Sequence, residues 1–235
     1  MKDSTVFLVL EQGFEFRYIL GTDIFTTLKK SGARIVILIP NLEEGYIADD
    51  YCDTNVVVEK LEIDAYNQYY ANSRLQQQFR FIATKALPQG ANFVHINEKG
   101  ESAEPTSRRG RLLMFLTDFA IAILRRSSRL RLFFQKVESF LFVGSHIHKR
   151  LFDRYSPDMV VTATPGHFTH DTYMLREARK RRIRAVSVVF GWDKAVARGL
   201  LRAPLDGVVI WGPPMREEMI QYQSFPAEKV FMAGP

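Results

Sequence analysis

Short apolar runs alternate with longer segments of mixed polarity, and this alternation predicts the fold. Each run is almost continuously hydrophobic, which is typical of strands buried on both faces of a parallel sheet. Val6–Leu10, the first run, ends at a turn that contains Gly13, and the second run stops at Pro40. We predict strands at residues 6–10, 35–39, 56–61, 159–163, 185–190, 207–211 and 230–232.

Helices are predicted in the segments between these strands. Gly32 follows the first helix as a C-terminal stop signal, and Pro214 stands at the start of the last one. The predicted helices cover residues 22–30, 64–87, 108–126, 128–155, 171–182 and 214–222, and the Gly/Pro/Ser-rich residues 88–107 are interpreted as a loop. The order predicts right-handed βαβ units in an α/β fold: a doubly wound, mostly parallel, Rossmann-like sheet with a helical insertion at about 88–155.

Composition narrows the class of protein. A chain of 235 residues that is 46% hydrophobic can bury a sizeable core, and we expect residues 1–235 to form one domain. The single cysteine, Cys52, excludes an internal disulfide framework. The apolar run at Val6–Leu10 is too short for a signal-peptide core, and no run approaches the roughly 20 residues of a membrane span. We therefore predict a cytoplasmic protein.

The net charge of +6 is concentrated in two basic patches. Residues 108–136 carry a local charge of +7 and residues 176–184 a charge of +5, which leaves −6 for the rest of the chain. Such patches favour anionic partners, including a membrane surface. We do not expect nucleic acid binding, because residues 176–184 lack aromatic side chains interleaved with the basic ones and read instead as the solvated face of a helix.

Ligands of doubly wound sheets bind beyond the carboxyl ends of the strands, where this chain places glycine and polar residues. Glu11 directly follows the first strand and is a candidate base or sugar-hydroxyl acceptor; His167 precedes a helix and is a candidate general base. The candidate substrate-binding residues at these ends are Gln12, Gly13, Thr164, Gly166, Gly191, Trp192 and Asp193. A purely structural interpretation stays open, with the glycines shaping turns, Asp193 capping one and Trp192 in the core.

Several motifs of cofactor and metal chemistry are absent from the sequence. The first strand is followed by EQGFEFR rather than G-x-G-x-x-G, and there is no Walker A, G-x-S-x-G or Cys/His metal spacing. His146 and His148 are two residues apart on a predicted helix, so their rings would point to different sides. We therefore expect neither a cofactor nor a metal ion.

Two segments resemble a known family. The segment FGWDKAVARG…PLDGVVIWGPPMREEMIQYQSFPAEKVFMAGP resembles a block of bacterial GT-B-type glycosyltransferase-like proteins of surface-polysaccharide synthesis, and RYILGTDIFTTLKKSGARIVILIP resembles their first βαβ unit. The resemblance implies that Trp192, Asp193 and Arg17 face the substrate cleft. Gly191, Lys194 and Arg198 stand where the family usually has Ser, Asn and Lys. The departure at Lys194, an expected substrate-binding position, bears on which acceptor is bound.

The resemblance also implies an activity. The chain would be the acceptor-side half of a glycosyltransferase, and the nucleotide-sugar donor would bind mainly to a C-terminal domain that is not included here. A base such as His167 or Glu11 would deprotonate a glycan or lipid-linked acceptor, and we expect the half alone to be inactive. Three alternatives stay open: a CDP-glycerol or CDP-ribitol phosphotransferase, a UDP-N-acetylglucosamine 2-epimerase, and a non-catalytic membrane-surface or nucleic-acid binding module.

Residues 107–134 raise a separate question. Leu112–Leu124 is apolar except at Thr117 and Asp118, and at about 1.5 Å per residue it spans roughly 20 Å, which is too short to cross a bilayer. It is therefore either a core helix that covers the sheet or a helix at a membrane interface. The flanking basic residues favour peripheral binding to anionic lipid on the inner membrane face; the membrane-binding candidates are Arg111, Arg125, Arg126, Arg129 and Arg131.

Overall fold

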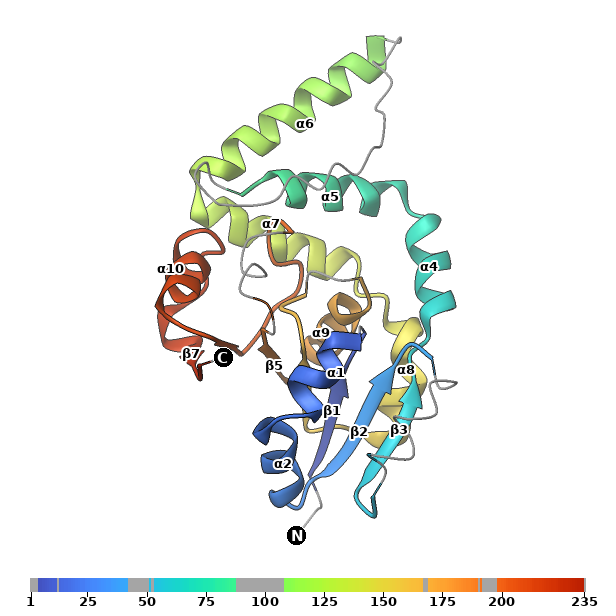
Figure 1. The fold of residues 1–235 in the computed structure, drawn as a ribbon. Coiled ribbons are helices and arrows are strands. Elements are labelled where there is room, and N and C mark those ends of the chain that lie inside the picture. Colours follow the sequence, from blue (N-terminus) through green and yellow to red (C-terminus); the bar gives the residue numbers. More distant parts are fainter. Residues whose placement is uncertain are drawn as a thin grey trace.

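The computed structural model describes residues 4–11, 13–41, 51, 53–87, 108–166, 169–189, 191 and 198–234. These residues form a seven-stranded, all-parallel sheet flanked by nine α-helices, and the predicted Rossmann-like α/β class is confirmed (Figure 1). The strands are β1 (Thr5–Val9), β2 (Arg34–Ile39), β3 (Val56–Lys60), β4 (Met159–Thr162), β5 (Arg184–Val188), β6 (Gly207–Ile210) and β7 (Val230–Met232). All seven lie within two residues of their predicted positions.

The strand order is β3-β2-β1-β4-β5-β6-β7. The chain first builds outward from β1 to β3 and then returns to the other side of β1 with β4, so the order reverses between β1 and β4. In register, Val6 of β1 lies between Ile35 of β2 and Met159 of β4. A reversal of this kind is the switch point at which open parallel sheets bind ligands.

Alternate residues of the central strands contribute to two separate hydrophobic cores, one on each face of the sheet. Phe7 and Val9 of β1 belong to the larger core, whereas Val6 and Leu8 belong to the smaller one. This split follows from the two-residue period of a strand, whose successive side chains point to opposite faces. Because both faces are covered by helices, both sets are apolar, which explains the continuous hydrophobic runs in the sequence.

The helices are distributed unequally between the two faces. The smaller core is closed by α1 (Gly13–Leu20) and α2 (Asp23–Lys30). The larger core is closed mainly by the helices of the second half of the chain. The other seven helices among the described residues are α4 (Ile63–Ala71), α5 (Arg74–Lys85), α6 (Arg108–Arg126), α7 (Ser128–Leu141), α8 (Ser145–Tyr155), α9 (Thr169–Lys180) and α10 (Pro213–Gln221).

The prediction of one helix over residues 128–155 is wrong, because the segment forms α7 and α8. Gly144 between them adopts a left-handed conformation with φ of +61°, which ends the helical path. A Cβ at this position would lie 2.6 Å from Cδ1 of Tyr173, so the break also lets α9 approach closely. The segment predicted over 64–87 is likewise two helices, and the Ser73 hydroxyl caps the second by accepting from the backbone N–H of Gln76 at 3.3 Å.

Helix α6 spans its predicted residues but does not cover the sheet. It extends away from the rest of the protein in Figure 1, and only Ile121 and Leu124 near its C-terminal end are buried among its large apolar side chains. Its exposed large apolar side chains are Leu112, Leu113, Met114, Phe115, Leu116 and Phe119. The interpretation of this stretch as a core helix is therefore wrong over most of its length.

Candidate functional site

A carboxyl cluster lies where β1 and β4 end side by side. Both strands are parallel, so their carboxyl ends meet at one edge of the sheet, at the reversal of strand order. Glu11 follows β1 by two residues, and Thr164 follows β4 by two residues. This edge brings together two residues that the sequence placed among the candidates.

Asp171 in the first turn of α9 joins the two strand ends. Its backbone N–H donates to Oε1 of Glu11 at 2.6 Å, and its side-chain Oδ2 accepts a hydrogen bond from the Thr164 hydroxyl. The Thr162 hydroxyl donates to the carbonyl of Thr164 at 2.7 Å and holds that turn in place. An acid in the first turn of a helix is favoured by the helix dipole and by free backbone N–H groups.

A third carboxyl, Glu15, comes from the first turn of α1. Its Oε2 accepts from the backbone N–H of Glu11 at 2.5 Å, so it caps the turn between β1 and α1. The side chain is 1% exposed, and Asp171 is 3% exposed. Two buried carboxyl groups, Glu15 and Asp171, therefore lie beside the partly exposed Glu11.

Burial and mutual repulsion change the acidity of this cluster. Burial raises the pKa of Glu11 well above its ordinary value, and the negative charges of Asp171 and Glu15 raise it further. Burial also raises the pKa of Asp171, although the hydrogen bond from Thr164 opposes the change. The cluster thus retains a proton at pH values at which isolated carboxyl groups have lost theirs. Carboxyl groups whose pKa is raised in this way are candidates for general acid or general base catalysis.

Two histidines lie in a buried aromatic pocket near this edge. The ring of His170, the residue before Asp171, packs edge-on against Tyr66 with 4.4 Å between ring centroids. Burial lowers the pKa of His170 to about 4, and burial together with the charge of His170 lowers that of His148 to about 3. Both rings are therefore neutral at pH 7. His146 is exposed whereas His148 is buried, which confirms that the two point to different sides.

Four other candidate residues from the sequence belong to the described part of the chain, and they differ in how directly they adjoin the carboxyl cluster. Gly166 has φ of +81° and accepts at its carbonyl from the hydroxyl of Thr172 in α9 at 3.0 Å, so it shapes the turn beside Asp171. Gly13 is exposed and begins α1, directly beyond the cluster, and Gly191 is half-buried beyond β5. Arg17 is exposed on α1, and no hydrogen bond or ion pair joins it to the carboxyl groups in the described residues.

Five candidates lie outside the residues that the structure describes. They are Gln12, His167, Trp192, Asp193 and Lys194. Their roles stay predictions from the sequence.

Asp171 and Glu15 were missed in the sequence, and each carried a weak signal. Glu15 follows Glu11 by four residues across a turn from a strand into a helix, where the second acid can cap the first residue's backbone. Asp171 opens a helix shortly after a strand end that already held Thr164 and Gly166. Neither signal identifies a partner, because Glu11 and Asp171 are 160 residues apart in the chain.

The proposed membrane-binding arginines have different environments. Arg111, Arg126 and Arg129 are exposed, and Arg125 is partly buried and donates to the carbonyl of Lys85 at 2.9 Å. The assignment of Arg131 to a membrane surface is wrong. Arg131 is 4% exposed, and its guanidinium group donates to the carbonyl of Leu124 and to the Ser224 hydroxyl. The group is therefore buried in the protein and cannot contact a membrane surface.

The basic run at residues 176–184 is only partly solvated. Arg176 is buried and forms an ion pair with Glu138 at 2.9 Å, and it also donates to the carbonyls of Arg202 and Phe142. Arg179, Lys180 and Arg182 are exposed. The interpretation of the whole run as an outer face is therefore wrong at its first residue, which forms part of the core.

No set of three or more His, Cys, Asp or Glu side chains able to hold a metal ion occurs among the described residues. In the same part of the chain, no helix is long and apolar enough to span a membrane. A scan against protein-family models and a search of curated proteins found no match to this sequence.

Proposed function

We propose that this chain binds a hydroxyl-bearing glycan acceptor at the β1/β4 edge and serves as the acceptor-side half of a GT-B-like glycosyltransferase. The observation that carries the proposal is the carboxyl cluster at the switch point of the sheet, in which Glu15 and Asp171 are buried beside the partly exposed Glu11. The resemblance of the two sequence segments to GT-B-type proteins supports the sugar chemistry. It also assigns the nucleotide-sugar donor mainly to a second domain.

The acid–base properties of the cluster suit such a transfer. A carboxylate whose pKa is raised by burial is a stronger base than a solvated one, so Glu11 can take the proton of an acceptor hydroxyl. The acceptor oxygen then bonds to the anomeric carbon of the donor sugar while the bond from that carbon to the nucleotide phosphate breaks. The proton ends on Glu11, and the leaving nucleotide carries the electron pair of the broken bond.

A binding experiment with the chain itself tests this proposal. We expect it to bind glycans on an oligosaccharide array, and Glu11→Gln to weaken that binding about tenfold or more, since a hydrogen bond to a charged group contributes about 1.5–3 kcal/mol. Glu217→Gln makes the same chemical change at an exposed position on α10 and serves as the control. Calorimetric titration with UDP-, GDP- and CDP-sugars should give no sub-micromolar binding.

Two results would contradict the proposal. Sub-micromolar binding of a nucleotide-sugar would place the donor site in this half of the molecule. Equal glycan binding by wild type and Glu11→Gln would show that the carboxyl cluster is not part of the acceptor site. If the complete enzyme transferred glycerol phosphate or ribitol phosphate from a CDP carrier, or epimerised UDP-N-acetylglucosamine, the alternative classes would replace sugar transfer.

We also propose that α6 attaches the protein peripherally to an anionic membrane. Leu112–Leu116 are five consecutive apolar residues, and at 100° per residue they occupy the full circumference of the helix. Each is about half exposed, so transfer into lipid is worth about 1 kcal/mol per side chain, roughly half the value for full burial. Arg111, Arg126 and Arg129 are exposed near the two ends, where each contributes about 1 kcal/mol beside anionic lipid.

Co-sedimentation with vesicles of phosphatidylcholine and phosphatidylserine tests the attachment. Wild type should pellet at low salt and less so at high salt, because screening weakens the arginine contribution. Phe115→Ser combined with Phe119→Ser should abolish pelleting. Leu75→Ser removes a similarly exposed apolar side chain from α5 and should have no effect. A wild-type protein that stays in the supernatant at low salt, or that forms a dimer through α6 in analytical ultracentrifugation, would refute membrane attachment.

A further inference from the structure

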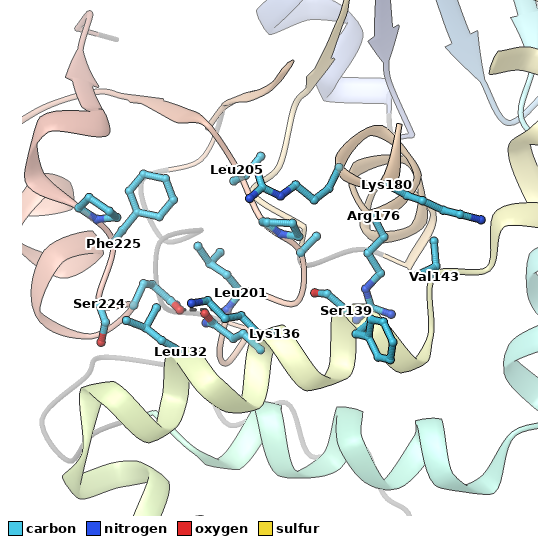
Figure 2. Close-up of a pocket in the computed structure, with 17 residues that line it drawn as sticks. Leu132, Lys136, Ser139, Val143, Arg176, Lys180, Leu201, Leu205, Ser224 and Phe225 are labelled. Carbon is cyan, nitrogen blue, oxygen red and sulfur yellow. Dashed lines mark hydrogen bonds between the residues drawn. The ribbon is translucent and has the colours of Figure 1, made fainter. Parts of the chain in front are cut away.

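A cavity of about 620 Å³ lies between α7, α9 and two chain segments of the C-terminal third. One segment is the crossover at residues 201–205 that leads into β6, and the other is the turn at residues 223–226 after α10. Figure 2 shows Ser224 and Phe225 on one side of the cavity and Arg176 and Val143 on the other. Its volume lies within the roughly 300–1,000 Å³ of small-molecule sites.

The inner wall of the cavity is apolar. Its apolar lining residues are Leu132, Phe140, Val143, Leu201, Ala203, Pro204, Leu205, Phe225 and Pro226. Leu201 and Phe225 are 4% and 8% exposed, so their side chains form the inner part of the wall rather than its rim. An apolar wall of this kind binds hydrocarbon through the hydrophobic effect and offers no hydrogen bonds to a polar ligand.

Most polar groups of the wall are already engaged within the protein. Ser139 donates to the carbonyl of Arg202 at 3.2 Å, and Arg176 donates to the same carbonyl and to that of Phe142. The Ser224 hydroxyl accepts from Arg131 at 2.9 Å. Gln135 differs, because its Nε2 is buried and has no hydrogen-bond partner within the described structure. The inner wall therefore offers a ligand few free hydrogen-bonding groups.

The charge around the cavity has one sign. Lys136 of α7 and Arg179 of α9 are exposed at its border, and neither forms an ion pair with a described residue. Lys180 is also present, with its ammonium group donating to the Ser145 hydroxyl at 2.7 Å. No aspartate or glutamate belongs to the described lining. Cations of two helices thus line the same cavity and no acidic residue of the described lining does, which favours an anion there.

We propose that this cavity binds a single-chain amphipathic anion, an alkyl chain that carries a phosphate or carboxylate head. The chain packs against Leu201, Leu205 and Phe225, and the head lies between Lys136 and Arg179. Phosphate and carboxylate share this chemistry, since both are acceptors that pair with ammonium and guanidinium groups. The proposal is independent of the glycosyltransferase function, because it uses none of the residues at the β1/β4 edge.

Other ligand classes fit the cavity less well. A free inorganic anion would leave the apolar wall unused, and an uncharged hydrocarbon would leave Lys136 and Arg179 without a partner. A sugar would bury hydroxyl groups against side chains that offer them no hydrogen bonds, which is costly. The combination of an apolar interior and a cationic border selects a molecule with both properties.

Isothermal titration calorimetry of the intact chain tests the proposal, with ligands kept below their micelle concentrations. The ligands are decyl phosphate, octyl phosphate, decanoate, decyl maltoside and inorganic phosphate. Decyl phosphate or decanoate should bind, and each added methylene should tighten binding about fourfold. Decyl maltoside should bind at least about tenfold more weakly, and inorganic phosphate should give no measurable heat.

Three variants locate the ligand. Lys136→Glu should weaken binding of the alkyl anion about tenfold or more, whereas Lys149→Glu, the same change on the exposed face of α8, should leave it unchanged. Val143→Trp should block the cavity, and circular dichroism checks that this variant folds. The proposal is overturned if neither alkyl anion binds, if decyl maltoside binds as tightly, or if the two lysine variants lose the same affinity.

Discussion

Glu138→Gln should destabilise the protein severely, because it removes the only carboxylate from a buried three-residue ion network. Oε1 of Glu138 accepts from Nε and Nη2 of Arg202 at 2.8 and 2.6 Å and lies 2.9 Å from Nη2 of Arg176. Glu138 is 0% exposed and the two arginines are 5% and 2% exposed. Glutamine preserves the shape of the side chain and deletes its charge, so two guanidinium groups are left facing each other in the core.

The expected magnitude follows from the burial of all three groups. Loss of one partner from a buried ion pair costs about 3–5 kcal/mol, mostly because the remaining charge is unpaired. Total unfolding free energies are about 5–15 kcal/mol, so the loss is a large fraction of the stability. For a chain of this size, about 2–4 °C per kcal/mol predicts a fall in Tm of about 6–20 °C. Burial already lowers the pKa of Arg176, and the charge of Glu138 is what opposes this effect.

Urea unfolding at pH 7.5, followed by circular dichroism, measures the change in free energy. Glu217→Gln on the exposed face of α10 is the matched control and should change stability by less than about 0.5 kcal/mol. Adding Arg202→Met to Glu138→Gln removes one of the two stranded charges, so the double variant should be more stable than the sum of the single effects by about 0.5–3 kcal/mol. A loss below about 1 kcal/mol for Glu138→Gln, or strict additivity in the double variant, would refute the reasoning.

Three further predictions concern buried titratable groups and a strained turn. The pKa of His148 is lowered to about 3, so on acidification the unfolded chain binds a proton at this histidine before the folded protein does. Stability is therefore lost as the pH falls from about 6.5 towards 3. Urea titration at pH 7 and pH 5 measures this decline in unfolding free energy, and His148→Gln should make it about 2 kcal/mol smaller. The pKa of Asp171 is raised by folding, so stability is lost as the pH rises above the ordinary pKa of an aspartate. Asp171→Asn should therefore be more favourable to the unfolding free energy at pH 8 than at pH 5. Equal effects at the two pH values would contradict a raised pKa. Gly199 has φ of +90°, and a Cβ there would lie 2.5 Å from Cα of Thr84, so Gly199→Ala should lower Tm by several degrees whereas Gly13→Ala, with no atom near its Cβ, should not.

The sequence by itself determined the order and type of most elements. Val6–Leu10 and residues 35–39 are continuous apolar runs that end at glycine or proline, and such local patterns specify buried parallel strands without reference to the rest of the chain. It also placed Glu11 and Thr164 at strand ends, and the fold brings them together through Asp171. The division of residues 128–155 into two helices was missed, because neither the left-handed conformation of Gly144 nor its close approach to Tyr173 of a distant helix can be inferred from the neighbouring residues in sequence.

Only the tertiary structure decided which side chains meet and which face water. Arg131 and Arg176 look like solvated charges in the sequence, yet both are buried, because distant segments supply Ser224 as a partner for Arg131 and Glu138 as a partner for Arg176. The apolar stretch of α6 looks like a core helix, yet only Ile121 and Leu124 near its C-terminal end are buried among its large apolar side chains. Hydrophobicity and charge are properties of single residues, whereas burial depends on contacts between elements far apart in the chain, such as Glu11 with Asp171.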